Sequence, residues 1–143
     1  MKFKLVIDEK KEEEVVVYAH EKTALIDEIE LLIANYSKSL IGYKDDEIIK
    51  FNLVDAECFF IENSKVYVYI NNKKLQMKIR LYEIEQHLND AFVRINQSCI
   101  INVKYIKKFK SSFNGALMVE LKNGYQDFVS RRELKKVKER MGL

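Results

Sequence analysis

Residues 92–106 read FVRINQSCIINVKYI, and they predict strand-like segments interrupted by one polar turn. Residues 91–95 and 105–110 have the composition of strands, and the apolar run Cys99–Ile101 lies between them. The intervening residues Arg94 to Ser98 place a guanidinium, two amides and a hydroxyl close together. This turn is therefore the richest source of hydrogen-bonding side chains in the segment.

Two interpretations of this turn remain open at the level of sequence. The amides of Asn96 and Gln97 can pair with adenine edges, and the hydroxyl of Ser98 can contact a phosphate, as Arg94 can. Alternatively, Asn96 and Ser98 cap the backbone of an ordinary polar turn. Four lysines follow closely and would place ammonium groups along an exposed strand face, as a surface that follows phosphates requires. These are Lys104, Lys107, Lys108 and Lys110.

The C-terminal residues predict a hairpin followed by a capped helix. Residues 116–121 and 125–129 flank Lys122–Gly124, which contains the Asn-Gly pair typical of tight hairpins. Ser130 and Glu133 form the pattern of a capping box at the start of a helix, and Gly142 suits its end. The apolar stripe of this helix consists of Leu134, Val137 and Met141.

Arg131 and Arg132 occupy the first turn of this predicted helix, where the helix dipole favours acidic residues. The arrangement suits an anion that binds at the helix start, where free amides and guanidiniums would converge on it. The alternative is an ion pair between one of these arginines and Asp127 or Glu120. The sequence alone supports both interpretations equally.

Upstream residues predict a mainly β fold with short helices. Hairpins are expected at 39–51 and 58–70, a further strand at 74–79 and a short helix at 81–88. The N-terminal residues predict a β-β-α extension, with strands at 2–7 and 15–17 and a helix over roughly 22–35. We therefore expect two units, a 1–38 extension and a 39–143 domain.

The charge is distributed unevenly along the chain. Residues 1–50 contain 8 lysines and 12 acidic residues, a net charge of −4, whereas residues 92–143 contain 12 basic and 4 acidic residues, a net charge of +8. A polyanion would therefore be attracted to the last third of the chain. A basic face that is merely solvated is the simpler explanation of the charge taken alone.

Several classes of function are disfavoured. No glycine-rich phosphate loop and no nucleophile elbow is present, so we expect no enzyme activity and no cofactor. Cys58 and Cys99 lie in apolar runs and are expected to be buried and reduced, and with two distant histidines they make a zinc site improbable. No segment is long and apolar enough to insert into a membrane, which suggests a cytoplasmic protein.

Three blocks in this order resemble LytTR DNA-binding domains. Phe92–Ile106 is similar to the family block of phenylalanine, arginine, serine, two aliphatic residues and asparagine. Lys122–Gly124 followed by Val129–Leu134 resembles the closing block, and Phe59–Glu62 with Val66–Ile70 resembles the first hairpin. The resemblance covers about residues 40–142 and implies small antiparallel sheets with short helices.

The resemblance also implies roles for individual residues. Loops of the family enter successive major grooves, so Gln97 and Arg132 correspond to base-reading positions. A third such position lies around Lys65–Tyr67 and is not located to a single residue. Asn96 departs from the pattern, because many members have histidine there. The positions that correspond to contacts with the DNA backbone are Ser98, Lys122 and Ser130.

The leading hypothesis is a bacterial transcription regulator that binds double-stranded DNA in a sequence-specific manner, as a homodimer on direct repeats. Residues 1–38 are too short for the receiver domain of many such regulators, so the chain resembles stand-alone members that are often paired with a small membrane regulatory protein. The extension could serve dimerisation, a regulatory partner or packing. The alternative function is a protein-binding module whose basic face meets an acidic partner, and RNA binding is a weaker third hypothesis. The expected DNA-binding residues are Lys65, Arg94, Asn96, Gln97, Ser98, Lys104, Lys122, Ser130, Arg131 and Arg132.

Overall fold

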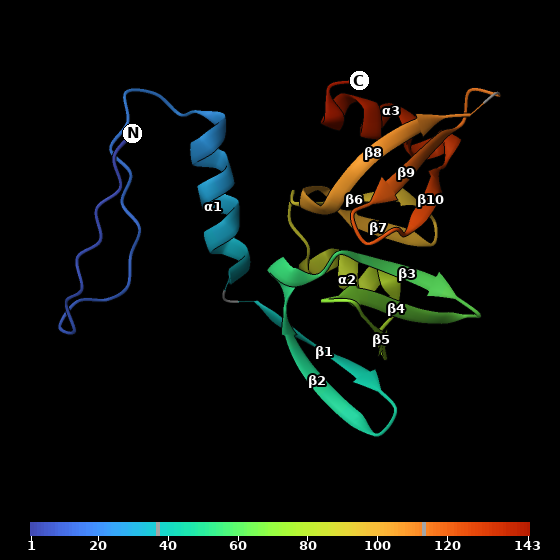
Figure 1. The fold of residues 1–143 in the computed structure, drawn as a ribbon, viewed down its shortest axis with the longest axis horizontal. Coiled ribbons are helices and arrows are strands. Elements are labelled where there is room, and N and C mark those ends of the chain that lie inside the picture. The colour runs from blue at the N-terminus through green and yellow to red at the C-terminus, as the bar shows by residue number, and fades with distance from the viewer. Residues whose placement is uncertain (37, 113) are drawn as a thin grey trace.

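The computed structural model describes residues 1–36, 38–112 and 114–143, and its elements are mainly antiparallel strands. An N-terminal helix precedes two sheets, and a third helix ends the chain (Figure 1). The elements, in chain order, are α1 (Ala24–Tyr36), β1 (Ser39–Lys44), β2 (Glu47–Asn52), the 3-10 turn η1 (Leu53–Asp55), β3 (Cys58–Glu62), β4 (Lys65–Ile70), β5 (Lys73–Met77), α2 (Leu81–His87), β6 (Phe92–Asn96), β7 (Cys99–Asn102), the 3-10 turn η2 (Val103–Tyr105), β8 (Ile106–Ser111), β9 (Leu117–Leu121), β10 (Gln126–Val129) and α3 (Arg131–Met141).

The strands form one larger and one smaller sheet. The larger sheet has the order β2-β1-β5-β4-β3-β7-β6, and the smaller one has the order β10-β9-β8. Both contain only antiparallel pairs, which confirms the predicted mainly β class. The tight turns use residues that tolerate positive φ, such as Asn71 (47°) and Asn72 (62°) between β4 and β5 and Gly124 (92°) between β9 and β10.

The central strands separate two apolar cores. Phe59 of β3 belongs to the core beneath α2, whereas its neighbours Cys58 and Phe60 belong to the core between the two sheets. Successive side chains of a strand point to opposite faces, so β3 must be apolar on both. Cys58 and Cys99 are buried and free, as predicted, and burial raises the pKa of both thiols.

The final helix is built as its sequence indicates. Ser130 is the N-cap, and its hydroxyl accepts a hydrogen bond from the Glu133 amide at 3.3 Å. Gly142 ends the helix in the left-handed conformation with φ 71°. Val137 is fully buried in the core between the sheets, and through this contact α3 packs against β6.

The prediction for the N-terminal extension is partly wrong. The helix is present as α1, but residues 2–7 and 15–17 are not strands. They run as two extended segments on either side of a turn at Asp8–Lys11, and no strand of the described chain pairs with them (Figure 1). A strand needs a hydrogen-bonded neighbour, and alternation of apolar residues cannot supply one. The proposed unit boundary at residue 38 stays a prediction, and Ser37 lies outside the described residues.

Candidate nucleic-acid interface

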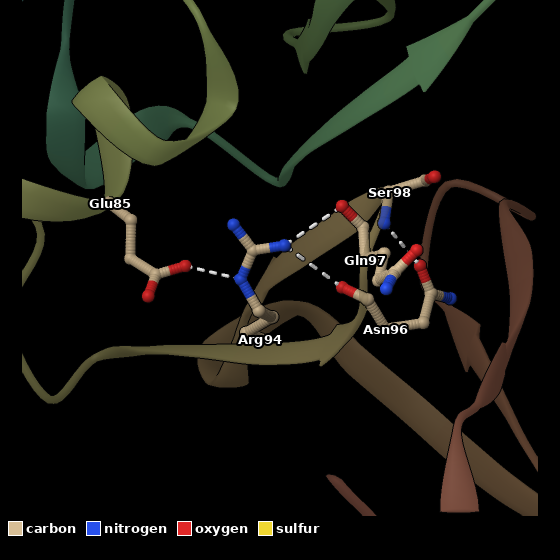
Figure 2. Close-up of polar contacts among 5 residues, drawn as sticks. All are labelled: Glu85, Arg94, Asn96, Gln97 and Ser98. Atoms are coloured by element: carbon tan, nitrogen blue, oxygen red, sulfur yellow. Dashed lines mark hydrogen bonds and ion pairs between the residues drawn. The ribbon is translucent and has the colours of Figure 1, made fainter. Parts of the chain in front are cut away.

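The Arg94 side chain supports the β6–β7 turn from within the molecule. Its Nε donates to the Glu85 carboxylate on α2, and its Nη1 donates to the carbonyl oxygens of Asn96 at 3.2 Å and Gln97 at 2.8 Å (Figure 2). The side chain is only 19% exposed. A guanidinium held by three acceptors fixes the turn relative to α2, so Arg94 is better suited to positioning the turn than to contacting a ligand itself.

Asn96 connects this turn to the start of α3. Its Oδ1 accepts from the Ser98 amide at 2.8 Å, and its Nδ2 donates to the Phe128 carbonyl at 2.8 Å. The Ser130 amide donates to the Ile95 carbonyl at 2.8 Å beside it. Both ends of the Asn96 amide are therefore engaged within the chain, which supports the interpretation of this residue as a turn cap.

Gln97 and Ser98 form the exposed tip of the turn. In Figure 2 the Ser98 hydroxyl points away from Arg94 and Asn96. Within the residues that the structure describes, neither the Gln97 amide nor the Ser98 hydroxyl has a hydrogen-bond partner. These are polar groups presented to solvent on a turn that Arg94 and Asn96 hold rigid.

Arg131 and Arg132 are exposed at the start of α3 and have no carboxylate partner among the described residues. The ion pairs suggested for them are absent, because both acids have other partners. Asp127 accepts from the Tyr125 hydroxyl at 2.9 Å. Glu120 lies 3.4 Å from Lys108 and accepts from Gln126 at 2.9 Å. Burial would raise the pKa of Glu120, but these bonds lower it below the usual value.

The β6–β7 turn and the start of α3 line one open hollow of about 650 Å³. Two cations at the positive end of a helix repel its dipole, and a bound anion would offset that cost. The hollow therefore combines free amide, hydroxyl and guanidinium groups with a helix N-terminus. It is lined by Glu85, Arg94, Asn96, Gln97, Ser98, Ser130, Arg132 and Glu133.

Comparison with known families matches residues 46–142 to the LytTr DNA-binding domain. The chain belongs to the LytTR family. Its fold resembles that of the LytTr DNA-binding domain of a protein described as a methyl-accepting/DNA response regulator from Bacillus cereus, with a TM-score of 0.68 at 23% identity over 73% of this chain and 97% of that one.

Two relatives in Staphylococcus aureus are named as HTH-type transcriptional regulators. The relative in strain NCTC 8325 is 39% identical over 107 residues, which are 75% of this chain and 73% of that protein. The relative in strain MSSA476 is 35% identical over 146 residues and is matched over 100% of this chain and 99% of its own length. Strands separate α1, α2 and α3, so the described part of this LytTR chain contains no helix-turn-helix.

The LytTR fold brings Lys65 to the same end of the sheet as Gln97 and Ser98. Phe60 of β3 pairs with Cys99 of β7, and the Ile61 amide donates to the Ser98 carbonyl at 2.8 Å. The β3–β4 turn, which leads into exposed Lys65, continues from this point. A ligand that covers the Gln97 turn would therefore also lie near Lys65.

Lys104 and Lys122 lie at the end of the smaller sheet that is farther from Ser130. The Lys122 amide donates to the Tyr105 carbonyl at 2.9 Å, which places its turn beside η2 and Lys104. Strand β10 separates this turn from Ser130. At the usual rise of a strand, the turn that contains Lys122 lies roughly 15–20 Å from Ser130. Both lysines are exposed, but they do not line the hollow.

Glu85 is the residue of this site that sequence reasoning missed. It lies on α2, nine positions from Arg94, with a helix end and a loop between them. No local pattern signals such a pair.

Among the described residues no helix could cross a membrane, and no cluster of histidine, cysteine and acidic residues could hold a metal.

Proposed function

We propose that this LytTR chain is a transcription regulator that binds double-stranded DNA with sequence specificity. The observation that carries the proposal is the open hollow at the start of α3, where the side chains of Gln97, Ser98 and Arg132 have no partner within the described part of the chain. The match to a family of DNA-binding domains and the names of the Staphylococcus relatives support the same role.

The geometry suggests that one set of residues contacts phosphates and another set contacts bases. The free amides at the start of α3, with Ser130 and Arg131, suit a phosphate. Gln97 and Arg132 suit base edges in the major groove, as amide and guanidinium groups can pair there bidentately. Arg94 and Asn96 then hold these readers in place and need not touch DNA themselves.

The hairpin around exposed Lys65 is proposed to supply the third base-reading position, and exposed Lys104 and Lys122 are proposed to contact the DNA backbone. Binding as a pair on direct repeats and regulation by a small membrane protein follow from the family resemblance. Both remain predictions for this chain.

The test is selection from a random duplex library with the wild type, Arg132→Ala and Arg140→Ala. Arg140 is the matched control, because it is an exposed arginine at the opposite end of α3. We expect an enriched motif that Arg132→Ala binds about 5- to 150-fold more weakly, equivalent to about 1–3 kcal/mol, with little change on random DNA. Equal losses on both kinds of DNA would reassign Arg132 to the backbone. No enrichment at low salt would overturn the proposal and favour the protein-binding module.

A further inference from the structure

The N-terminal arm, residues 1–36, leaves most of its large apolar side chains exposed. It comprises the two extended segments and α1, and it extends away from the sheets (Figure 1). Of the 19 large hydrophobic side chains found exposed in the described residues, 12 belong to this arm. They are Met1, Phe3, Leu5, Val6, Ile7, Val15, Val16, Val17, Tyr18, Leu25, Leu32 and Ile33.

Such an arm is not expected to be stable in isolation. No side chain in residues 1–34 is buried, and α1 meets the rest of the chain chiefly at η1. An isolated helix of 13 residues is marginal in water, and so is a single pair of strands. The arm therefore needs a further surface to cover its apolar side chains.

The two extended segments of the arm carry charges of opposite sign. In the first extended segment, Lys2 and Lys4 alternate with apolar residues. The second segment instead begins with the acidic run Glu12–Glu14, which precedes the apolar run Val15–Val17. When two arms lie side by side, the lysine segment of one can neighbour the glutamate segment of the other. Opposite charges on neighbouring strands stabilise the pairing.

The available apolar area also matches what a dimer requires. The 12 side chains are on average about two-thirds exposed. At roughly 60–120 Å² for a large apolar side chain, they offer roughly 500–900 Å². A stable interface removes about 800 Å² from each partner.

We infer that the N-terminal arm is a dimerisation element that packs against the same arm of a second copy. Two arms together supply four extended segments, enough for a stable sheet, with the apolar stripes of two α1 helices available to cover it. The inference rests on the proposed function only for the use of the dimer on DNA. Because η1 is the main contact between arm and body, the two DNA-binding domains need not follow the two-fold symmetry of the arms.

The first test measures the mass of the full-length protein in solution without DNA over a range of concentrations. The wild type is expected to be a dimer. Leu5→Glu and Leu25→Glu should each raise the dimer dissociation constant about 30-fold or more, the loss expected of a central interface residue. Ile48→Glu is the control, since Ile48 is 71% exposed on β2, outside the arm. A monomeric wild type, or dissociation by Ile48→Glu alone, would overturn the inference.

A charge-swap experiment distinguishes a second copy from the chain's own body. One variant carries Lys2→Glu and Lys4→Glu, and the other carries Glu12→Lys and Glu14→Lys. Each alone should be mainly monomeric, and an equimolar mixture should form heterodimers. If mixing restores nothing, the arm packs within its own chain or on another protein, and the inference fails.

Binding to a duplex with a single site keeps this result separate from the proposed function. A monomeric Leu5→Glu variant should bind that duplex with unchanged affinity. If neither the wild type nor this variant binds any duplex, the proposed function fails, whereas the dimer measurement stands by itself.

Discussion

Substitution of Asn96 by alanine tests whether this residue positions the DNA-reading turn. The change removes the bonds from the Ser98 amide and to the Phe128 carbonyl, both 2.8 Å long. A net hydrogen bond contributes about 0.5–1.5 kcal/mol, and water can partly replace these exposed ones, so we expect a loss of about 1–2 kcal/mol. With a usual urea dependence, the unfolding midpoint should fall by roughly 0.5–1 M.

The same substitution should weaken DNA binding without changing which bases are preferred. Once Asn96 no longer connects the turn to the end of β10, Gln97 and Ser98 must be ordered at the moment of binding. Ordering a side chain costs about 0.5–1.5 kcal/mol, which corresponds to roughly a 2- to 10-fold loss of affinity. The motif enriched from a random library should stay the same.

Gln97→Ala is the matched control at the adjacent position. The side-chain amide of Gln97 has no hydrogen-bond partner among the described residues, so its removal should leave the free energy of unfolding unchanged within about 0.5 kcal/mol. It should instead relax the preference at one base position. Urea titration and library selection on both variants provide the comparison. The reasoning is refuted if Asn96→Ala keeps full stability while losing base preference.

Three further results are expected. Lys104→Ala and Lys122→Ala should each weaken binding equally on cognate and random DNA and reduce the salt slope by about 1, as measured by titration at several salt concentrations; a loss confined to cognate DNA would contradict a backbone role. The free energy of unfolding should fall as pH rises above 9.0, the ordinary pKa of a thiol, because the pKa values of buried Cys58 and Cys99 are raised and only the unfolded chain ionises its thiols in this range. In urea titrations at several pH values, Cys99→Ala should reduce the dependence of this free energy on pH by up to about 1.4 kcal/mol per pH unit. An unchanged pH dependence would exclude the Cys99 thiol as a cause. Gly42→Ala should cost about 1–3 kcal/mol in urea unfolding, because a new Cβ would lie 2.8 Å from the Leu75 Cβ, and an unaffected midpoint would mean that the neighbouring side chain moves away freely.

Much of the fold could be predicted because its signals are local. The Asn-Gly pair at Asn123–Gly124 and the Asn71–Asn72 pair place hairpin turns where the structure has them. Ser130 and Gly142 mark the ends of α3 because capping depends on residues only a few positions apart. Local backbone preference and alternation were sufficient for these elements.

The same local signals failed for the N-terminal arm. Phe3, Leu5 and Ile7 alternate as a half-buried strand would, yet each is at least 70% exposed. Alternation reports a tendency to bury one face, but burial requires another element to cover that face. In this chain no described element does so, which is why the dimer inference begins there.

The sequence by itself determined the family, the strand-rich class and the candidate residues Gln97 and Arg132. Only the tertiary structure decided which polar side chains are free. Asn96 donates to the Phe128 carbonyl and Arg94 to the Glu85 carboxylate, whereas the arginines at the start of α3 have no carboxylate partner among the described residues. These outcomes depend on contacts between residues from different elements. Their geometry is set by how the sheets and helices pack, and no local sequence pattern encodes it.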